Sequence, residues 1–187
     1  MKYALSSGSP RRKALFAVIC KEFEVCRPSE PKGMEKDGKA ADVALNLAVF
    51  KAQWGALRNP GKKVVGADTL IEFERKIIGK PKSAKEAREI LRALSGKNFA
   101  VFSGVCVSFF GGKGKIRKKA WVERAKVGFR KISETEISNY VKSKKWVGKA
   151  GGFNVGKMPA CKWVREVKGD VNTVIGLPLE RLKKEIK

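Results

Sequence analysis

Hydrophobic side chains recur at helical spacing along much of the chain, most clearly between residues 40 and 57. Val43, Leu47, Phe50 and Trp54 follow one another at intervals of three or four positions, which places them on one face of a helix. Serine caps and similar spacing mark further helices. The sequence predicts helices at Arg11–Cys20, Ala40–Leu57, Ala84–Leu94, from the cap Ser133 to Lys142, and at Leu179–Ile186.

Runs of β-branched and alternating apolar residues predict the strands between these helices. Lys63–Val65 is expected as a short strand, and after Gly66 and Ala67 a second strand, Thr69–Phe73, turns into Ile77 and Ile78. Strands and helices mix without strict βαβ alternation, so we expect an α/β fold with a mixed sheet, formed by one domain spanning residues 1–187. The remaining strands are expected at Lys2–Ser6, Phe23–Cys26, Phe99–Phe110, Lys115–Phe129, Cys161–Glu166 and Val174–Ile175.

Two extremes of composition limit which catalytic groups, metal sites and partners the chain can have. The chain has no histidine, which excludes catalysis by a histidine base and any histidine-ligated metal. Acid–base work then falls to Asp, Glu, Lys, Tyr or Cys, and a bound metal would be a hard cation on oxygen ligands. The formal net charge is +24, and so strong a field attracts nucleic acid as well as nucleotide substrates.

Several observations predict a cytoplasmic protein that does not enter a membrane. No apolar run approaches the roughly 18 residues of a membrane span, and two arginines interrupt the first segment where a signal peptide needs apolar residues. The four cysteines form no C-x-x-C pair, and the surroundings of Cys106 and Cys161 suit buried thiols. Unpaired thiols are typical of a reducing compartment.

The first predicted helix begins with an arrangement suited to anions. Ser9 is a natural cap and Pro10 fits the first helical position. Arg11 and Arg12 then lie in the first turn, where the helix dipole disfavours cations unless an anion joins them. Free backbone N–H groups beside two guanidinium groups therefore favour a phosphate site, although both arginines could instead form ordinary salt bridges.

A second candidate region surrounds Asp68, which follows a predicted strand, and Lys80, which follows a predicted hairpin. An acid at a strand end and a lysine in a nearby loop suit phosphate chemistry. From this stretch alone, a turn-capping Asp68 and a solvated Lys80 are favoured. Lys51 lies beside the apolar stripe of its helix, and its pattern favours an ordinary solvent-facing lysine.

Short motifs in a fixed order resemble the Maf family of nucleoside triphosphate pyrophosphatases along essentially the whole chain. They are SSGSPRRKAL, LAVFKA, GADT followed by GKP, LSG, AGGF and GLPL. The resemblance implies the Maf/inosine-triphosphatase-like fold, an elongated mixed sheet flanked by helices, with two lobes and a central cleft. It is also compatible with a homodimer.

The resemblance implies roles for particular residues. Asp68 would be the general base or a metal ligand, with Glu30, or its rival Glu35, as a second acid for Mg²⁺ or Mn²⁺. The cation would stabilise the leaving pyrophosphate while water attacks the α-phosphorus. The phosphate-binding residues would be Ser7, Arg11, Arg12, Lys51 and Lys80.

The chain departs from the family where the base is read. The family usually carries YGIQG in the segment that begins at Gly152 here, and Gly156 stands at its glutamine. The usual His and Thr after LSG are replaced by Phe99 and Ser103. Arg11 and Thr69 match the branch that resembles dTTP/UTP pyrophosphatases, so a dTTP, UTP or modified pyrimidine substrate is expected.

Two other functions stay open at this point. The charge of +24 motivates a basic nucleic-acid-binding protein on the same scaffold. The family's association with septum arrest motivates a non-catalytic regulator of cell division, although the retained Asp68, Lys51 and Lys80 favour an enzyme. A pyrophosphatase that removes unwanted nucleotides from the pool is the preferred hypothesis.

Overall fold

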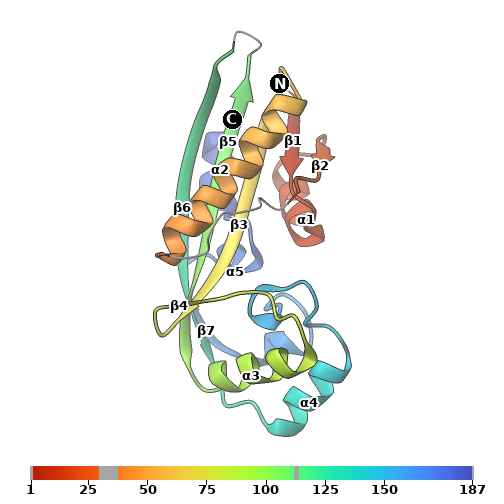
Figure 1. Cartoon of the computed structure of the whole chain (residues 1–187), viewed down its shortest axis with the longest axis vertical. Coiled ribbons are helices and arrows are strands. Elements are labelled where there is room, and N and C mark those ends of the chain that lie inside the picture. Colours follow the sequence, from red (N-terminus) through yellow and green to blue (C-terminus); the bar gives the residue numbers. More distant parts are fainter. Residues whose placement is uncertain (1, 30–37, 112–113, 187) are drawn as a thin grey trace.

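The computed structural model describes residues 2–29, 38–111 and 114–186, and it contains a seven-stranded mixed sheet flanked by helices (Figure 1). Six strands follow one another in the order β2-β1-β3-β5-β6-β7, and β4 pairs with β3. β1, β2 and β3 are parallel, whereas the other pairings are antiparallel. The expected α/β architecture with a mixed sheet is confirmed.

The elements alternate irregularly along the chain. The strands are β1 (Tyr3–Ser6), β2 (Glu24–Cys26), β3 (Lys63–Phe73), β4 (Lys76–Ile78), β5 (Asn98–Phe110), β6 (Ile116–Phe129) and β7 (Val164–Lys168). The helices are α1 (Pro10–Ile19), α2 (Ala40–Arg58), α3 (Ala84–Leu94), α4 (Glu134–Lys142), α5 (Val171–Ile175) and α6 (Leu179–Glu185), with 3₁₀ turns at Ala150–Gly152 and Ala160–Trp163.

The upper part of Figure 1, here called the sheet half, is a sheet covered on both faces. Where α2 covers one face, the packed side chains are small: Ala48 and Ala52 of α2 cluster with Cys106 of β5. On the opposite face, Phe16 of α1 and Leu182 of α6 pack with sheet residues. The helix α2 lies very close to the strands because Gly66 has no side chain: a Cβ there would lie 2.6 Å from the Ala48 carbonyl oxygen.

The lower part, here called the helical half, contains α3, α4, β7 and the 3₁₀ turns around the lower ends of the long strands. Its core is aromatic. The Phe129 ring meets those of Phe99, Phe153 and Trp163 edge-on, with centroids 4.9, 4.9 and 6.2 Å away. Edge-to-face packing of this kind is favourable for aromatic rings. The two halves share β3, β5 and β6, so they are joined by continuous strands.

Two of the sequence-based expectations for strands are wrong. The segment split at Gly66 and Ala67 is one strand, β3, because β5 pairs with it continuously from Lys63 to Glu72. Val174 and Ile175 belong to the helix α5 instead of a strand. The Asp170 side chain caps that helix by accepting from the Asn172 N–H at 2.8 Å, and Gly176 ends it.

Smaller corrections concern the C-terminal third. The expected strand Cys161–Glu166 is a 3₁₀ turn followed by β7, and Cys161 is half-buried, whereas Cys106 is fully buried as expected. The described part of the chain has no helix that combines the length and apolar character needed to cross a bilayer.

Candidate active site at a gap in the sheet edge

The candidate site lies where one edge of β3 lacks a neighbouring strand. β1 pairs with β3 up to Ser6 opposite Gly66, and β4 begins to pair on the same edge at Ile71. Between them, Ala67–Leu70 has no partner on this side among the described strands. Because β1 and β4 both end toward this gap, the chain segments that follow them, with Ser7 and Lys80, are directed to Asp68 and Thr69.

Asp68 faces α2, from which Lys51 reaches it. Lys51 Nζ donates to Asp68 Oδ1, and the two side chains are only 13% and 15% exposed. The pair forms because α2 approaches the strand closely at this level, where Gly104 is paired opposite Asp68 on β5. The pattern-based interpretation of Lys51 as solvent-facing is therefore wrong, and so is that of Asp68 as a turn cap.

Arg12 holds the other side of the gap together. Its Nε donates to the Gly176 carbonyl at 2.9 Å, Nη2 to Thr69 Oγ1 at 3.1 Å, and Nη1 to Ser7 Oγ at 3.4 Å. These acceptors come from the end of α5, from β3 and from the turn after β1. One guanidinium thus fixes the distances between three separate segments.

The Thr69 hydroxyl belongs to a chain of hydrogen bonds that continues into β5. Ser103 Oγ donates to the Thr173 carbonyl at 2.8 Å, and it lies 2.8 Å from Thr69 Oγ1. Because Ser103 has a single hydroxyl proton, Thr69 donates to Ser103 and is left to accept from Arg12. Ser103 is fully buried. Sequence reasoning noted Ser103 only as a departure and missed this positioning role.

Burial and neighbouring positive charges lower the pKa values of the cations at the site. Burial is the largest cause of a lowered pKa at Lys51. The carboxylate of Asp68 opposes this, while the charges of Arg12 and Lys80 lower the Lys51 pKa further. Burial also lowers the pKa of Arg12, again opposed by Asp68. The Asp68 carboxylate thus lies among three cations, and burial opposes the charged forms of Lys51 and Arg12.

Arg11 interacts electrostatically with Tyr140 of the helical half. Its pKa is lowered first by burial and then by Arg12, whereas Tyr140 raises it. In turn, burial raises the pKa of Tyr140 to about 12, and the charge of Arg11 opposes that rise. Successive residues of a helix point about 100° apart. The two arginines at the start of α1 therefore serve different sides of the site.

A family model described as Maf-like protein matches residues 2–187. The chain belongs to the Maf family. It is 36% identical over 187 residues to a dTTP/UTP pyrophosphatase of Bacillus cereus (strain B4264), an alignment that covers 100% of this chain and 94% of that protein. A dTTP/UTP pyrophosphatase of Bacillus cytotoxicus is 36% identical over 186 residues, with the same coverage.

A HAM1 protein from Coxiella burnetii shares the fold of this Maf chain. Its solved structure superimposes with a TM-score of 0.53 at 14% sequence identity, covering 100% of this chain and 98% of that one. This likeness confirms the expected architecture.

Not all residues expected from the Maf resemblance meet at the gap. Ser7, Arg12, Lys51 and Thr69 surround Asp68, and the charge of Lys80 acts on Lys51. The charge of Arg11 acts on Arg12 and Tyr140. Glu30 and Glu35 lie outside the described residues.

The donor atoms at the gap fit a hard divalent cation in kind. Asp68 supplies carboxylate oxygens, which Mg²⁺ and Mn²⁺ prefer. No group of three or more Asp, Glu, Cys or His side chains occurs within the ranges that the structure describes. Asp68 would therefore hold a cation with further ligands from Glu30 or Glu35, from water and from substrate phosphate.

Gly156 lies on a loop beside α5. A Cβ at this position would lie 3.6 Å from the Ile175 side chain, and Ile175 precedes the Gly176 carbonyl that binds Arg12. The loop thus borders the Arg12 side of the gap, with no side chain at the position where the Maf family usually has glutamine.

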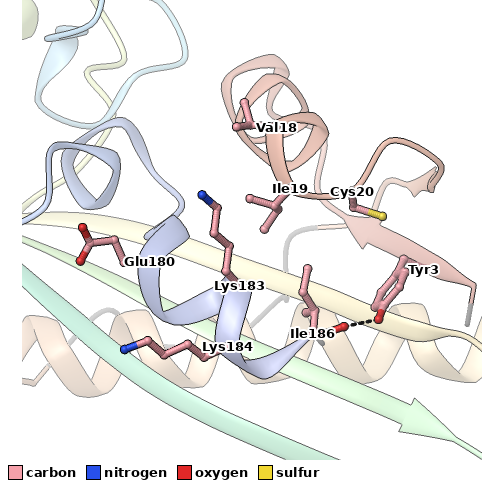
Figure 2. A pocket seen from close by; sticks show the side chains of 8 residues that line it. All are labelled: Tyr3, Val18, Ile19, Cys20, Glu180, Lys183, Lys184 and Ile186. Carbon is pink, nitrogen blue, oxygen red and sulfur yellow. Dashed lines mark hydrogen bonds between the residues drawn. The ribbon is translucent and has the colours of Figure 1, made fainter.

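A groove elsewhere on the sheet half contains none of these residues. It encloses about 550 Å³ between the C-terminal end of α1 and α6, and its walls include Tyr3, Ile19 and Ile186 (Figure 2). Ile19 lies about 12 Å along α1 from Arg11, given the helical rise of 1.5 Å per residue. Its walls also carry Glu180, Lys183 and Lys184, and none of the residues expected from the Maf resemblance lines it.

Proposed function

We propose that this Maf-family chain is a nucleoside triphosphate pyrophosphatase, which hydrolyses the bond between the α and β phosphates to give a nucleoside monophosphate and pyrophosphate. The observation that carries this proposal is the Asp68 carboxylate, placed among Arg12, Lys51 and Lys80 at the gap in the sheet edge. The curated relatives support it, since both are named dTTP/UTP pyrophosphatases.

The residues at the gap would divide the work of one in-line displacement. Asp68 would accept a proton from water, or orient it, as the water oxygen bonds to the α-phosphorus. The bond to the bridging oxygen breaks, and its electron pair leaves with pyrophosphate. Arg12, Lys51 and Lys80 would neutralise the phosphate oxygens, where charge stabilisation supplies most of the catalysis. Ser7 would donate a hydrogen bond to the same oxygens.

The reaction would use a divalent cation, Mg²⁺ or Mn²⁺, held by Asp68 together with Glu30. Bound there, it would offset the charge that develops on the phosphate oxygens. Lys51 already contacts Asp68, so the cation would share the carboxylate with this lysine.

The relatives favour a pyrimidine nucleotide, dTTP or UTP, as the substrate. Arg11 and Thr69 carry the branch-specific side chains. Thr69 is fixed by Arg12 and Ser103, so its contribution would be to shape the site. Gly156 leaves room near Ile175 that a glutamine would fill, which favours a tolerance for modified bases. The four cysteines are free thiols, consistent with action in the reducing cytoplasm.

The test compares pyrophosphate release by the wild-type chain and by Asp68→Asn, across canonical and modified nucleoside triphosphates with Mg²⁺ or Mn²⁺. We expect release from dTTP or UTP, and a loss of about 100-fold or more in kcat/KM for the variant, the scale of acid–base catalysis. Asp42→Asn, on α2 but outside the site, is the matched control and should keep full activity. No release by the wild type from any triphosphate would contradict the proposal.

A further inference from the structure

One end of the sheet half, at the top of Figure 1, gathers positive charge that the mechanism above does not use. Residues 52–67, which form the end of α2 and the start of β3, contain no aspartate or glutamate, and neither do residues 98–122, which form β5 and the first half of β6. The cations of these two segments that the structure describes are Arg58, Lys62, Lys63, Lys115, Arg117, Lys118 and Lys119.

Two acids from other elements neutralise part of this charge. Glu24 of β2 pairs with Lys62 at 2.5 Å, and Glu185 of α6 pairs with Lys119 at 2.7 Å. Within residues 2–29, 38–111 and 114–186, no ion pair reaches the other five cations. This end of the sheet therefore keeps an excess of positive charge that attracts polyanions.

Strand pairing places two of the unpaired cations on either side of an aromatic ring. Lys63 of β3 is paired with Phe109 of β5, and Phe109 is paired with Arg117 of β6. Paired residues of neighbouring strands point to the same face, and the strands lie about 4.8 Å apart, so the Phe109 ring stands between the two cations. Tyr3 of β1 is paired with Lys63 and extends this outer row (Tyr3, Lys63, Phe109 and Arg117) to a fourth strand.

The outer row lies where α6 stops covering the sheet. Val65 and Lys119 belong to the next row inward, where Val65 is buried in the core under α1 and α6, and Lys119 pairs with Glu185 near the end of α6. The Tyr3 hydroxyl donates to the carbonyl of Ile186, the residue that follows α6 (Figure 2). The helix therefore ends at the level of the outer row.

The two phenylalanines at the end of β5 have different surroundings. Phe110 packs with Ala56 and Val64 beneath α2. Phe109 points to the opposite face, and the hydrophobic clusters of the described residues do not include it. Its side chain is half-buried, Lys63 is half-buried as well, and Arg117 is exposed. A half-exposed ring between two cations suits a nucleic-acid base with a phosphate on each side.

We propose that the outer row binds single-stranded nucleic acid, with one base stacked on Phe109 and the adjoining phosphates held by Lys63 and Arg117. Proteins that bind single strands combine positive charge along the path of the backbone with aromatic side chains on which bases stack. Because the bases of a duplex are already paired and stacked on one another, a ring at this position favours a single strand over a duplex.

The outer row is separate from the candidate active site. Lys63 precedes Asp68 by five residues of an extended strand, which corresponds to about 17 Å. Nucleic-acid binding there requires neither the Asp68 carboxylate nor the hydrolysis of a triphosphate. It therefore does not rest on the proposed pyrophosphatase activity, and each can fail without the other.

The first test removes the ring and keeps every charge. Binding of a fluorescent oligo(dT) of about 20 nucleotides, longer than one site, is measured by anisotropy with the full chain. Phe109→Ala should weaken binding about tenfold, the scale of one lost base stack, and Phe109→Tyr should keep most of the affinity. Urea unfolding checks that both variants are folded.

The second test removes charge from the outer row. The double variant Lys63→Gln and Arg117→Gln should reduce the slope of log K against log salt by about 1.4, because each phosphate contact of a single strand contributes about 0.7. The matched control, Lys85→Gln with Lys97→Gln, removes the same charge from exposed lysines in and after α3, and should keep the slope. Lys51→Gln, at the candidate active site, should keep the affinity.

Three results would overturn the proposal. Equal losses in the outer-row double variant and in its control would show that net charge alone attracts the strand. Wild-type affinity in Phe109→Ala would exclude stacking on this ring, and lost binding in Lys51→Gln alone would place the strand at the candidate active site. Binding of anionic phospholipid vesicles that depends on the outer row, without any binding of oligo(dT), would assign the surface to a membrane and would contradict the proposal as well.

Discussion

The two halves of the molecule fill their cores in opposite ways. In the sheet half, α2 lies on the strands through alanines and glycines, so that backbone meets backbone near Gly66 and Gly104. In the helical half, the rings of Phe99, Phe129 and Trp163 fill a much wider space between strands and helices. The first core tolerates no added atoms, and the second depends on its bulk.

The different packing of the two halves determines what each half contributes to the candidate site. The Lys51–Asp68 pair requires α2 to lie close to β3, which the small residues permit. Large aromatic side chains instead give the helical half a core that can carry an irregular loop, with Phe153 buried within it. The sheet half thus places Asp68 beside Lys51, while the helical half supports the loop that carries Gly156.

The largest expected decrease in stability follows from removing an aromatic ring from the helical half. Phe129→Ala should lower the free energy of unfolding by about 3–5 kcal/mol, because it removes a fully buried ring and leaves a cavity. Urea unfolding at pH 7 measures this. Phe129→Leu keeps much of the volume and should cost less. Equal losses for both variants would show that ring volume is not what stabilises this half.

A smaller decrease in the free energy of unfolding should follow from adding one methyl group in the sheet half. A Cβ at Gly104 would collide with the backbone of Ala44, which cannot move without shifting α2. Gly104→Ala should therefore cost about 2–3 kcal/mol in the same urea titration. Gly79→Ala is the matched control, since a Cβ there meets nothing within 4 Å. If Gly104→Ala were as stable as its control, the close approach of α2 would be refuted.

The smallest effect concerns charge at the surface of the helical half. Hydrogen bonds from Arg130, and next from the Ser133 backbone, lower the pKa of Glu136 to about 2. A depressed carboxyl pKa stabilises the fold above its ordinary value near 4.5, and this stabilisation is lost as the pH falls toward 2. Because the pair is over one-third exposed, it should contribute less than about 1 kcal/mol.

Glu136→Gln measures that contribution when its unfolding free energy is compared with wild type at pH 7, 5, 4 and 3. The difference between the two proteins should be largest at pH 7 and shrink below pH 4.5. Glu180→Gln, at an exposed glutamate of α6, should show no such trend. A difference that stays constant with pH would contradict the role of the Glu136 charge.

Local patterns predicted much of the fold because helix and strand periodicity depends on neighbours in sequence. The helix around Val43 and Leu47 and the capping box of Ser133 with Glu136 follow directly from such patterns. The strand predictions were wrong where contacts between residues distant in sequence, or helix caps, determine the local structure. Pairing with β5 carries β3 through Gly66 and Ala67, and the caps Asp170 and Gly176 turn an apolar pair into helix α5.

The sequence alone determined the chemistry that the molecule has available: no histidine, many cations, and Asp68 within a motif order that indicates the Maf family. Tertiary structure decided which cation meets which partner. Arg12 binds Gly176 from 164 positions away, and Lys51 meets Asp68 because α2 lies close to β3. Periodicity assigns a side chain to a face of its own element, whereas the gap exists only once separate strands have paired.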